Sequence, residues 1–476
     1  MIQASEDEIQ VAVLENDKVV ELFMGNSIKE AFSGNIYLGR IENVLPGMQS
    51  AFIDIGLNKN AFLYVEEAVP FDLKQETEEV RISDCVKKGQ KMIVQVIKEP
   101  VRQKGSRVTR HITIPGRYLV LMPMNNHLGI SRKIEDETEA QRLRAILEEI
   151  KHPDIGIIAR TNAESASADA LKEDVEMLTA IWAKILAEAE KAQPPALLHS
   201  EGSVLEKMMR DVVNNQVGKI VINDQKSYEI LKAFRQTSGF TFALEMIDEK
   251  ELFSVYGIKN DIVAALSRKI WLDNGSYVVF DETEALASID VNTGKFIGTS
   301  NFEDTILQTN MKAIKEIVRQ IRLRNLGGII IIDFIDMQSK EKKDLLIEAL
   351  KMELKKDRVK SHIFGITTLG LVEMTRKKVG CTLSSVFERK CQNCEGRGRV
   401  TSERHVFAMI REDLKEYLKE NKYKNIIVRV SAFMYNYLIN HNAKIIKNME
   451  EKMGILIVII EEQEFPADHY VIEGVN

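Results

Sequence analysis

The sequence predicts a multidomain protein that combines α/β and α+β architecture, for three reasons. The chain has 476 residues, which is too many for a single compact core. Short β-like runs punctuated by glycine fill much of residues 9–97, as in small barrels. After Pro194-Pro195, helical and strand-like segments alternate, which is typical of an α/β core with buried strands.

The composition narrows the class of protein further. No uninterrupted apolar stretch approaches the roughly 20 residues that a membrane-spanning helix needs, and acidic residues stand where an export signal would be basic. Four cysteines are too few for a disulfide framework, so we expect a cytoplasmic protein with no membrane segment. A net charge of −6 excludes a general coat for nucleic acid, so any RNA binding must be local.

The beginning of the chain is predicted to be sheet. Residues 9–23 alternate in polarity and break at Asn16-Asp17, two residues that tolerate positive φ, which predicts a β-hairpin. Residues 34–67 and 91–97 continue with short strands, and we expect them to form a small barrel.

The next part is predicted to be mainly helical. Residues 136–151 and 163–191 have helical periodicity, and the second helix is expected to stop before the linker at Pro194-Pro195. Between the two helices, residues 154–164 contain a brief apolar strand that ends in an Arg-Thr pair.

The α/β core follows the linker. Its predicted segments are strands at 219–223, 277–280 and 329–332 and a long helix at 305–326. Residues 390–400 are too rich in Cys, Gly and Arg to form regular structure. A helix at 403–420 and an α+β tail then predict a separate small domain.

Two motifs in the core present oxygen ligands. In SIDVNTGK, Asp290 and Asn292 are two apart, so a strand would point both side chains to one face. The apolar run GGIIIID places Asp333 at the carboxyl end of a buried strand, followed by Asp336. Such strand ends are where α/β folds place ligands. Magnesium takes oxygen ligands and often only one or two carboxylates, so this set suits it.

The same spacing also has a purely structural interpretation. Asp290 and Asn292 could open a turn before Gly294, and Asp333 could cap the next element. On spacing alone the turn is the somewhat stronger interpretation, and neither motif is decisive.

Cys391 and Cys394 form a C-x-x-C followed by Gly396 and Gly398. Thiolates at this spacing can share a zinc ion, but a structural site needs four ligands and the chain has no second C-x-x-C. Three explanations remain open: Cys381 or a histidine completes the shell, the pair is a redox dithiol, or two chains donate two thiolates each. A redox pair normally accompanies a thioredoxin-like βαβ setting, which the sequence does not indicate here, so zinc is favoured.

The ordered combination of SIDVNTG, GGIIIIDFIDM and CQNCEGRGR resembles the RNase E/G family of endoribonucleases over nearly the whole chain. The resemblance implies an RNase-H-like domain interrupted by an OB-type RNA-binding barrel and a 5′-sensor domain, then a DNase-I-like catalytic domain, a zinc segment and a small C-terminal α+β domain. The implied boundaries are 1–34 with 205–265, 35–110, 111–204, 266–388, 389–401 and 402–476.

The resemblance also implies a reaction. Asp290 and Asp333 would bind catalytic Mg²⁺, and Asn292 would form a hydrogen bond near the scissile phosphate. The family hydrolyses single-stranded RNA to 5′-monophosphate and 3′-hydroxyl ends, in rRNA processing and mRNA decay. None of the eight histidines lies in either motif, which disfavours a paired-histidine mechanism through the 2′-hydroxyl.

In the barrel, the resemblance implies that Phe52 and Phe62 stack on bases and that Lys104 makes a basic contact. Arg102, Arg107 and Arg110 add local positive charge. Without the resemblance, a phenylalanine in a strand is usually part of the core.

The resemblance further implies that Arg160 and Thr161 sense a 5′-monophosphate, with backbone contributions from Gly116 and Val120. Judged alone, Arg160 would more often form a surface ion pair. Where many relatives have a second arginine, this chain has Lys360, a point charge and not a planar fork, so 5′-end discrimination is expected to be weaker.

In the family the cysteine pair joins two protomers through a shared zinc, which implies at least a dimer, and a tetramer if two dimers pair. No long polar arm follows Asn476, so assembly of a degradosome through such an arm is not expected. Two rival functions remain: an RNA-binding regulator without catalysis, and a single-strand DNA nuclease that uses the same metal site.

Overall fold

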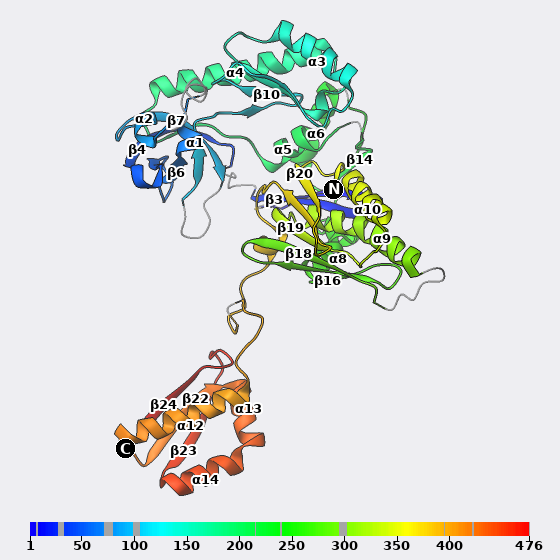
Figure 1. Cartoon of the computed structure of the whole chain (residues 1–476). Helices are drawn as coiled ribbons and strands as arrows, with labels where there is room; N and C mark the ends of the chain where they lie inside the picture. Colours follow the sequence, from blue (N-terminus) through cyan, green and yellow to red (C-terminus); the bar gives the residue numbers. More distant parts are fainter. Residues whose placement is uncertain are drawn as a thin grey trace. The chain divides into compact units, whose positions relative to one another are not determined.

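A computed structural model describes residues 1–5, 8–26, 33–70, 80–98, 105–214, 216–238, 240–294, 302–394, 396–420 and 423–475. The chain has two compact units, Met1–Leu383 and Ser384–Asn476 (Figure 1). The predicted mixed α/β architecture with a small barrel is confirmed, and both features belong to the first unit.

A five-stranded sheet joins the start of the chain to the region after the linker, in the order β15-β14-β1-β2-β3. Asn16 and Asp17, with φ of 50° and 62°, close the predicted β2–β3 hairpin. Ile2, Val11 and Ile222 lie in its core with residues from α5 and α6. The elements are β1 Ile2–Ala4, β2 Glu8–Glu15, β3 Lys18–Asn26, α5 Val204–Asp211, β14 Lys219–Ile222, α6 Gln225–Ser238, β15 Ala243–Met246, α7 Leu252–Val255 and α8 Ile258–Leu266.

The barrel closes because β4 pairs with both β5 and β7, so the order β4-β5-β6-β8-β7 returns to β4. Its small core uses alternate residues of each strand, including Ala51, Ile53, Ala61 and Leu63. The elements are β4 Ile36–Leu45, η1 Pro46–Met48, β5 Ser50–Asp54, β6 Ala61–Tyr64, α1 Val65–Ala68, α2 Ile82–Cys85, β7 Lys91–Lys98 and β8 Arg107–Thr109, with β13 Ala196–His199 added beside β4.

A four-stranded sheet, β11-β12-β10-β9, packs against two helices next along the chain. The predicted helix at 163–191 begins later, at Ala168, because Thr161–Ala163 forms a 3₁₀ turn and Ser167 caps the helix. The elements are β9 Ile114–Pro115, β10 Leu119–Met122, β11 Leu128–Ile130, α3 Glu137–Ile150, β12 Gly156–Ala159, η3 Thr161–Ala163 and α4 Ala168–Lys191.

A six-stranded sheet, β16-β17-β18-β19-β21-β20, follows, and we refer to it below as the central sheet. Apolar residues of one face, among them Ile289, Ile330 and Ile332, are buried with residues of α9 and α10. Figure 1 shows both helices beside the sheet. The elements are β16 Lys269–Trp271, β17 Tyr277–Glu282, β18 Leu286–Asn292, α9 Phe302–Leu323, β19 Gly328–Asp333, α10 Lys340–Leu354, β20 Ser361–Ile366, β21 Val372–Arg376 and α11 Leu383–Phe387.

The second unit has its own core around the three-stranded sheet β23-β22-β24. β22 and β23 are parallel and are joined through α13 and α14. The elements are α12 Glu403–Glu420, β22 Asn425–Ser431, α13 Ala432–His441, α14 Ala443–Met453, β23 Leu456–Glu462 and β24 Tyr470–Val475. In the described part of the chain, no helix has both the length and the apolar composition to cross a membrane.

Candidate catalytic site and RNA-binding surfaces

Asp333 is the last residue of β19, and Asp290 lies two residues before the end of the adjacent parallel strand β18. The two aspartates are direct partners in the β18–β19 register. Neighbouring strands lie about 4.8 Å apart, and partners in register point to the same face. Both side chains are exposed, on the face of the central sheet opposite α9 and α10. Asn292 shares this face, and its Nδ2 donates a hydrogen bond to Oδ2 of Asp290 at 2.8 Å. The structure therefore brings the three predicted catalytic residues together.

Two further carboxylates, those of Asp290 and Asp336, lie close enough to Asp333 to affect its ionisation. Partial loss of solvation raises the pKa of Asp333 although the residue is exposed, and the negative charges of Asp290 and Asp336 raise it further. A divalent cation would relieve this repulsion, and two carboxylates beside a carboxamide are a suitable oxygen set for Mg²⁺. Among the described residues no cluster of three or more His, Cys, Asp or Glu could hold a metal, so any ion here would need ligands from water or substrate phosphate.

The turn expected before Gly294 is present, but it does not replace the site. Gly294 has φ of 58°, and β18 nevertheless continues through Asn292. Asp333 caps no helix, because Ser339 caps α10. The turn therefore accounts for the glycine at position 294. The helix-cap interpretation does not account for Asp333, because Asp333 caps no helix.

Sequence reasoning missed Asn310, which is fully buried in α9. Its Nδ2 donates to the carbonyl of Ile335 at 2.9 Å, and its Oδ1 accepts from the Ile335 N–H at 3.1 Å. These two bonds fix the backbone just after Asp333. A signal was available, since Asn310 interrupts an apolar stripe that includes Ile306 and Ile314.

The phenylalanines of the barrel lie outside its core. Phe52 and Phe62 are cross-strand partners, half-buried, with ring centroids 5.8 Å apart. Tyr64, which the sequence analysis missed, stacks beside Phe62 with centroids 6.4 Å apart and could have been found two residues along the same strand. Arg107 approaches the Tyr64 ring at 6.0 Å. Lys104 lies outside the described residues.

Arg160 is already paired within the protein. One guanidinium nitrogen donates to the carbonyl of Gly116 at 2.6 Å, and another donates to Asp211 at 2.7 Å. Burial opposes ionisation of Asp211, but hydrogen bonds and charges from Arg210 and Arg160 outweigh it and lower the pKa of Asp211. The expected ion pair is therefore present at the candidate sensor. Thr161 beside it is exposed.

The backbone groups predicted for this pocket are partly engaged. The N–H of Gly116 donates to the Leu119 carbonyl at 2.8 Å, while Val120 lies in β10 opposite Ile158 of β12. Asp174 leaves no space for a side chain at Gly116, because a Cβ there would lie 2.7 Å from its carboxylate. Lys360 is exposed and follows a loop whose Asp357 and Arg358 carbonyls accept hydrogen bonds from Lys133.

In the second unit, Cys391 is exposed and Cys394 is buried. The N–H of Gly398 donates to the Cys394 sulfur at 3.3 Å. Hydrogen bonds from the backbone N–H groups of Gly398 and Gly396 lower the pKa of Cys394, which favours the thiolate that a metal ligand requires. The next helix, α12, begins only at Glu403, so the pair does not open a helix.

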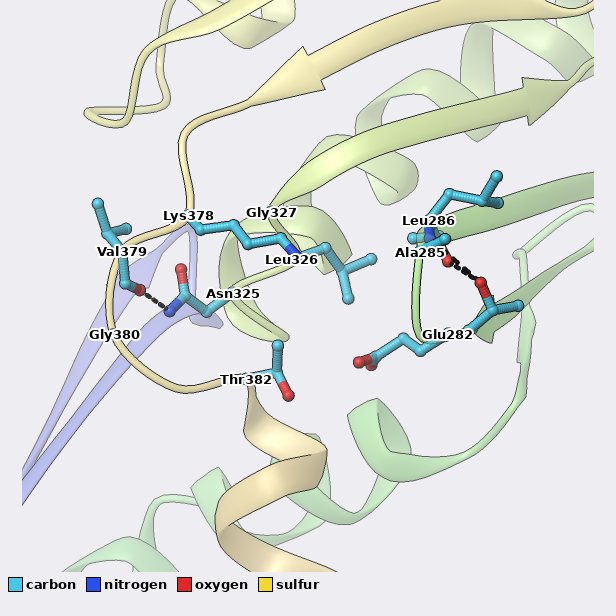
Figure 2. A pocket seen from close by; sticks show the side chains of 12 residues that line it. Glu282, Ala285, Leu286, Asn325, Leu326, Gly327, Lys378, Val379, Gly380 and Thr382 are labelled. Carbon is cyan, nitrogen blue, oxygen red and sulfur yellow. Dashed lines mark hydrogen bonds between the residues drawn. The ribbon is translucent and has the colours of Figure 1, made fainter. Parts of the chain in front are cut away.

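A cavity of about 130 Å³ lies at the opposite end of the same strands, where β18 and β19 begin. Figure 2 shows its lining, with the Lys378 side chain extended beside Gly327 and the Asn325 amide bonded to the Val379 carbonyl. Asp290 and Asp333 do not line it. The two carboxylates lie on an exposed face of the sheet and outside this cavity, where a long substrate such as a polymer can reach them.

Comparison with known proteins shows the family to which the chain belongs. Residues 113–379 match the model of the Ribonuclease E/G family. Ribonuclease G of Haemophilus influenzae is 37% identical over 99% of this chain and 98% of its own length. Ribonuclease G of Escherichia coli strain K12 is 38% identical over 87% of this chain and 86% of its own length. Ribonuclease E of a Nostoc species is 37% identical over 81% of this chain and 57% of its own length.

Residues 390–475 match a second model, described as the thioredoxin-like domain of RNase E/G. The expectation that no thioredoxin-like setting accompanies the cysteine pair was therefore wrong. The parallel β22–β23 pair with its helical connection was missed because both strands lie well after the cysteines, at Asn425–Ser431 and Leu456–Glu462.

Proposed function

Because the chain belongs to the ribonuclease E/G family and is an endoribonuclease, we propose that it hydrolyses single-stranded RNA with Mg²⁺ held by Asp290 and Asp333. The observation that carries this proposal is the direct register of the two aspartates on β18 and β19. Cleavage would leave 5′-monophosphate and 3′-hydroxyl ends.

Each residue has a distinct part in the reaction. Asp290 and Asp333 would supply carboxylate oxygens to the ion from two strands. Bound Mg²⁺ lowers the pKa of coordinated water and stabilises charge on the phosphate. Asn292 orients Asp290 through its amide hydrogen bond and stands on the face that the scissile phosphate would approach. Asn310 holds the segment after Asp333 in place.

The test uses matched single-stranded RNA and DNA of one sequence, with Mg²⁺ and without added divalent cation. We expect only RNA to be cut, only with Mg²⁺, and the product ends to carry the phosphate on the 5′ side. Equal cleavage of DNA would favour a single-strand nuclease that does not discriminate sugars. Full activity without a divalent ion would contradict the metal mechanism.

We further propose that Arg160 and Thr161, with backbone from Gly116 and Val120, bind a 5′-monophosphate. The support is a guanidinium beside an exposed hydroxyl. The phosphate would have to displace the carboxylate of Asp211 from its ion pair with Arg160. Lys360 has no guanidinium group, so it cannot bind the phosphate through two parallel hydrogen bonds as a second arginine would. Equal cleavage rates for 5′-monophosphorylated and 5′-hydroxyl forms of one RNA would reject this sensor.

The cysteine pair is proposed to bind zinc shared between two chains. Cys391 and Cys394 supply half of a tetrahedral shell, and backbone N–H groups stabilise the Cys394 thiolate. The expected stoichiometry is one zinc per dimer, measured by metal analysis together with solution mass. One zinc per monomeric chain would contradict a shared site.

The remaining domain assignments are also proposals. We assign the five-stranded sheet to an RNase-H-like domain and the barrel to RNA binding through Phe52, Phe62 and Lys104. The four-stranded sheet would be the 5′-sensor domain and the central sheet the DNase-I-like catalytic domain. In cells, we place the enzyme in rRNA processing and mRNA decay, which mapping of RNA ends with and without the protein would test.

A further inference from the structure

Two aromatic rings and a lysine form a cluster on the exposed face of the central sheet. Trp271 and Tyr277 are partners in the β16–β17 register, with ring centroids 5.1 Å apart. The Lys269 Nζ lies 4.0 Å from the Trp271 ring centre and 3.4 Å from that of Tyr277. We call these three residues the aromatic cluster.

The aromatic cluster borders the candidate catalytic residues. Tyr277 is the direct cross-strand partner of Asn292, and Val279 is the partner of both Asp290 and Lys269. Because strands are spaced about 4.8 Å apart, Trp271 lies about 10 Å from Asn292 across the sheet. The cluster and the carboxylates therefore share one face, with the cluster one or two strands from Asp290 and two or three strands from Asp333.

The Trp271 ring is accessible to a ligand, whereas Tyr277 is half-buried and its ring is in contact with Lys269. Trp271 is 58% exposed, whereas the neighbouring Ile270 and Val278 fill the core on the other face. At Gly294, a Cβ would lie 2.3 Å from the Gly275 carbonyl and 3.3 Å from the Tyr277 ring, so no side chain from that position can stand beside the ring. A cross-strand aromatic pair also stabilises its hairpin, but that role does not require a tryptophan more than half exposed.

We propose that the aromatic cluster is a base-stacking platform for single-stranded RNA, separate from the barrel and about one or two nucleotides from the scissile phosphate. Base stacking on Trp271 and Tyr277 would hold the strand, and Lys269 would neutralise a backbone phosphate in a chain whose net charge is −6. The proposal rests on the proposed function, because the bound strand is the substrate of Asp290 and Asp333.

The first test is fluorescence. The chain has two tryptophans, and the other, Trp182, is only 9% exposed, so RNA contact should be reported by Trp271. A 5′-hydroxyl RNA is titrated into the full chain without added divalent cation, so that it is not cut. We expect saturable quenching that Trp271→Phe removes, and Trp271→Ala should weaken binding roughly 5- to 100-fold. Phe433→Ala, which removes a ring 64% exposed in the second unit, is the matched control and should bind normally.

The second test locates the base. Single abasic nucleotides are placed along an RNA with one cleavage site, and kcat/KM is measured with Mg²⁺. In the wild type, an abasic nucleotide at one position near the cut should lower kcat/KM. In Trp271→Ala the same abasic nucleotide should cause no further loss of kcat/KM. In Trp271→Tyr the loss caused by the abasic nucleotide should return. Unchanged quenching, affinity and abasic profile in a folded Trp271→Ala protein would overturn the platform. Full cleavage by Asp290→Asn with normal quenching would instead overturn the proposed catalytic site alone.

Discussion

The two candidate phosphate-handling sites of this enzyme differ in how their charges are compensated. At the ends of β18 and β19, Asp333 faces the like charges of Asp290 and Asp336, which raise its pKa after burial has already done so. At the candidate sensor, Arg160 is neutralised by Asp211 at 2.7 Å. At the first site the described carboxylates repel one another, whereas at the second Arg160 already has a carboxylate partner, which it shares with Arg210.

This difference predicts two kinds of binding. A cation at the carboxylates adds a missing charge, so its loss should abolish the chemistry. A 5′-phosphate that binds Arg160 must displace the carboxylate of Asp211. Its binding free energy is therefore the difference between the energies of the Arg160–phosphate and Arg160–Asp211 ion pairs, and we expect it to be small. Mutations should therefore have large effects at the first site and modest effects at the second.

Removal of one catalytic carboxylate should have the largest effect. Asp290→Asn or Asp333→Asn is expected to lower kcat roughly 100- to 1000-fold, because the ion loses a charged ligand, while RNA affinity stays near wild type. The control is Glu373→Gln, an exposed carboxylate on the adjacent strand β21. Single-turnover cleavage and equilibrium binding measure both quantities. Glu373→Gln as slow as either aspartate variant would show that only general negative charge matters.

Loss of the two hydrogen bonds between Asn310 and Ile335 should have an intermediate effect on kcat. Asn310→Leu removes both bonds to Ile335, so the segment after Asp333 loosens, and we expect kcat to fall roughly 10- to 100-fold with little change in KM. Thr309→Val is the control, since it removes a buried hydrogen bond within α9 alone. If both variants lose stability but keep kcat, Asn310 is only structural.

At the sensor, Asp211→Asn should strengthen binding of 5′-monophosphorylated RNA about 2- to 10-fold, because the competing charge on Arg160 is lost. Glu201→Gln provides the comparison, because Glu201 pairs with Arg210 and Lys207 and not with Arg160. Competition binding with 5′-monophosphate and 5′-hydroxyl RNAs measures the ratio. A loss of 5′ preference in Asp211→Asn would mean that Asp211 positions Arg160 instead of competing for it.

The smallest expected effect is a shift in pH dependence. Because the folded-state pKa of Asp333 is raised, its protonation stabilises the metal-free fold at acid pH, and this stabilisation is lost as pH rises through that pKa. Mg²⁺ needs the ionised form, so activity should fall as pH drops through the same range. Asp336→Asn removes one like charge and should move this acid limb of kcat/KM to lower pH. An unchanged limb would contradict the contribution of Asp336.

Much of the site could be predicted from the chain itself. The two-residue spacing of Asp290 and Asn292 and the apolar run before Asp333 fix the face and the strand end of each side chain. The register that makes Asp290 and Asp333 partners could not be predicted from the sequence. The two residues are 43 positions apart (333 minus 290), and their pairing depends on how β18 and β19 pack against α9.

Contacts between distant parts of the chain were equally hidden. Nothing local to Arg160 indicates Asp211, which lies 51 residues away. Tyr64, Tyr277 and Trp271 were missed because an aromatic in a strand is ordinarily core, and only burial shows which face it occupies.

The most direct test of the shared ion is a titration with Mn²⁺, an oxygen-seeking substitute for Mg²⁺ that is visible by electron paramagnetic resonance. The wild type should bind one ion per chain at the carboxylates, and both Asp290→Asn and Asp333→Asn should lose it while remaining folded. Retention of the wild-type stoichiometry and affinity in either variant would contradict the claim that these two aspartates hold one metal ion between them.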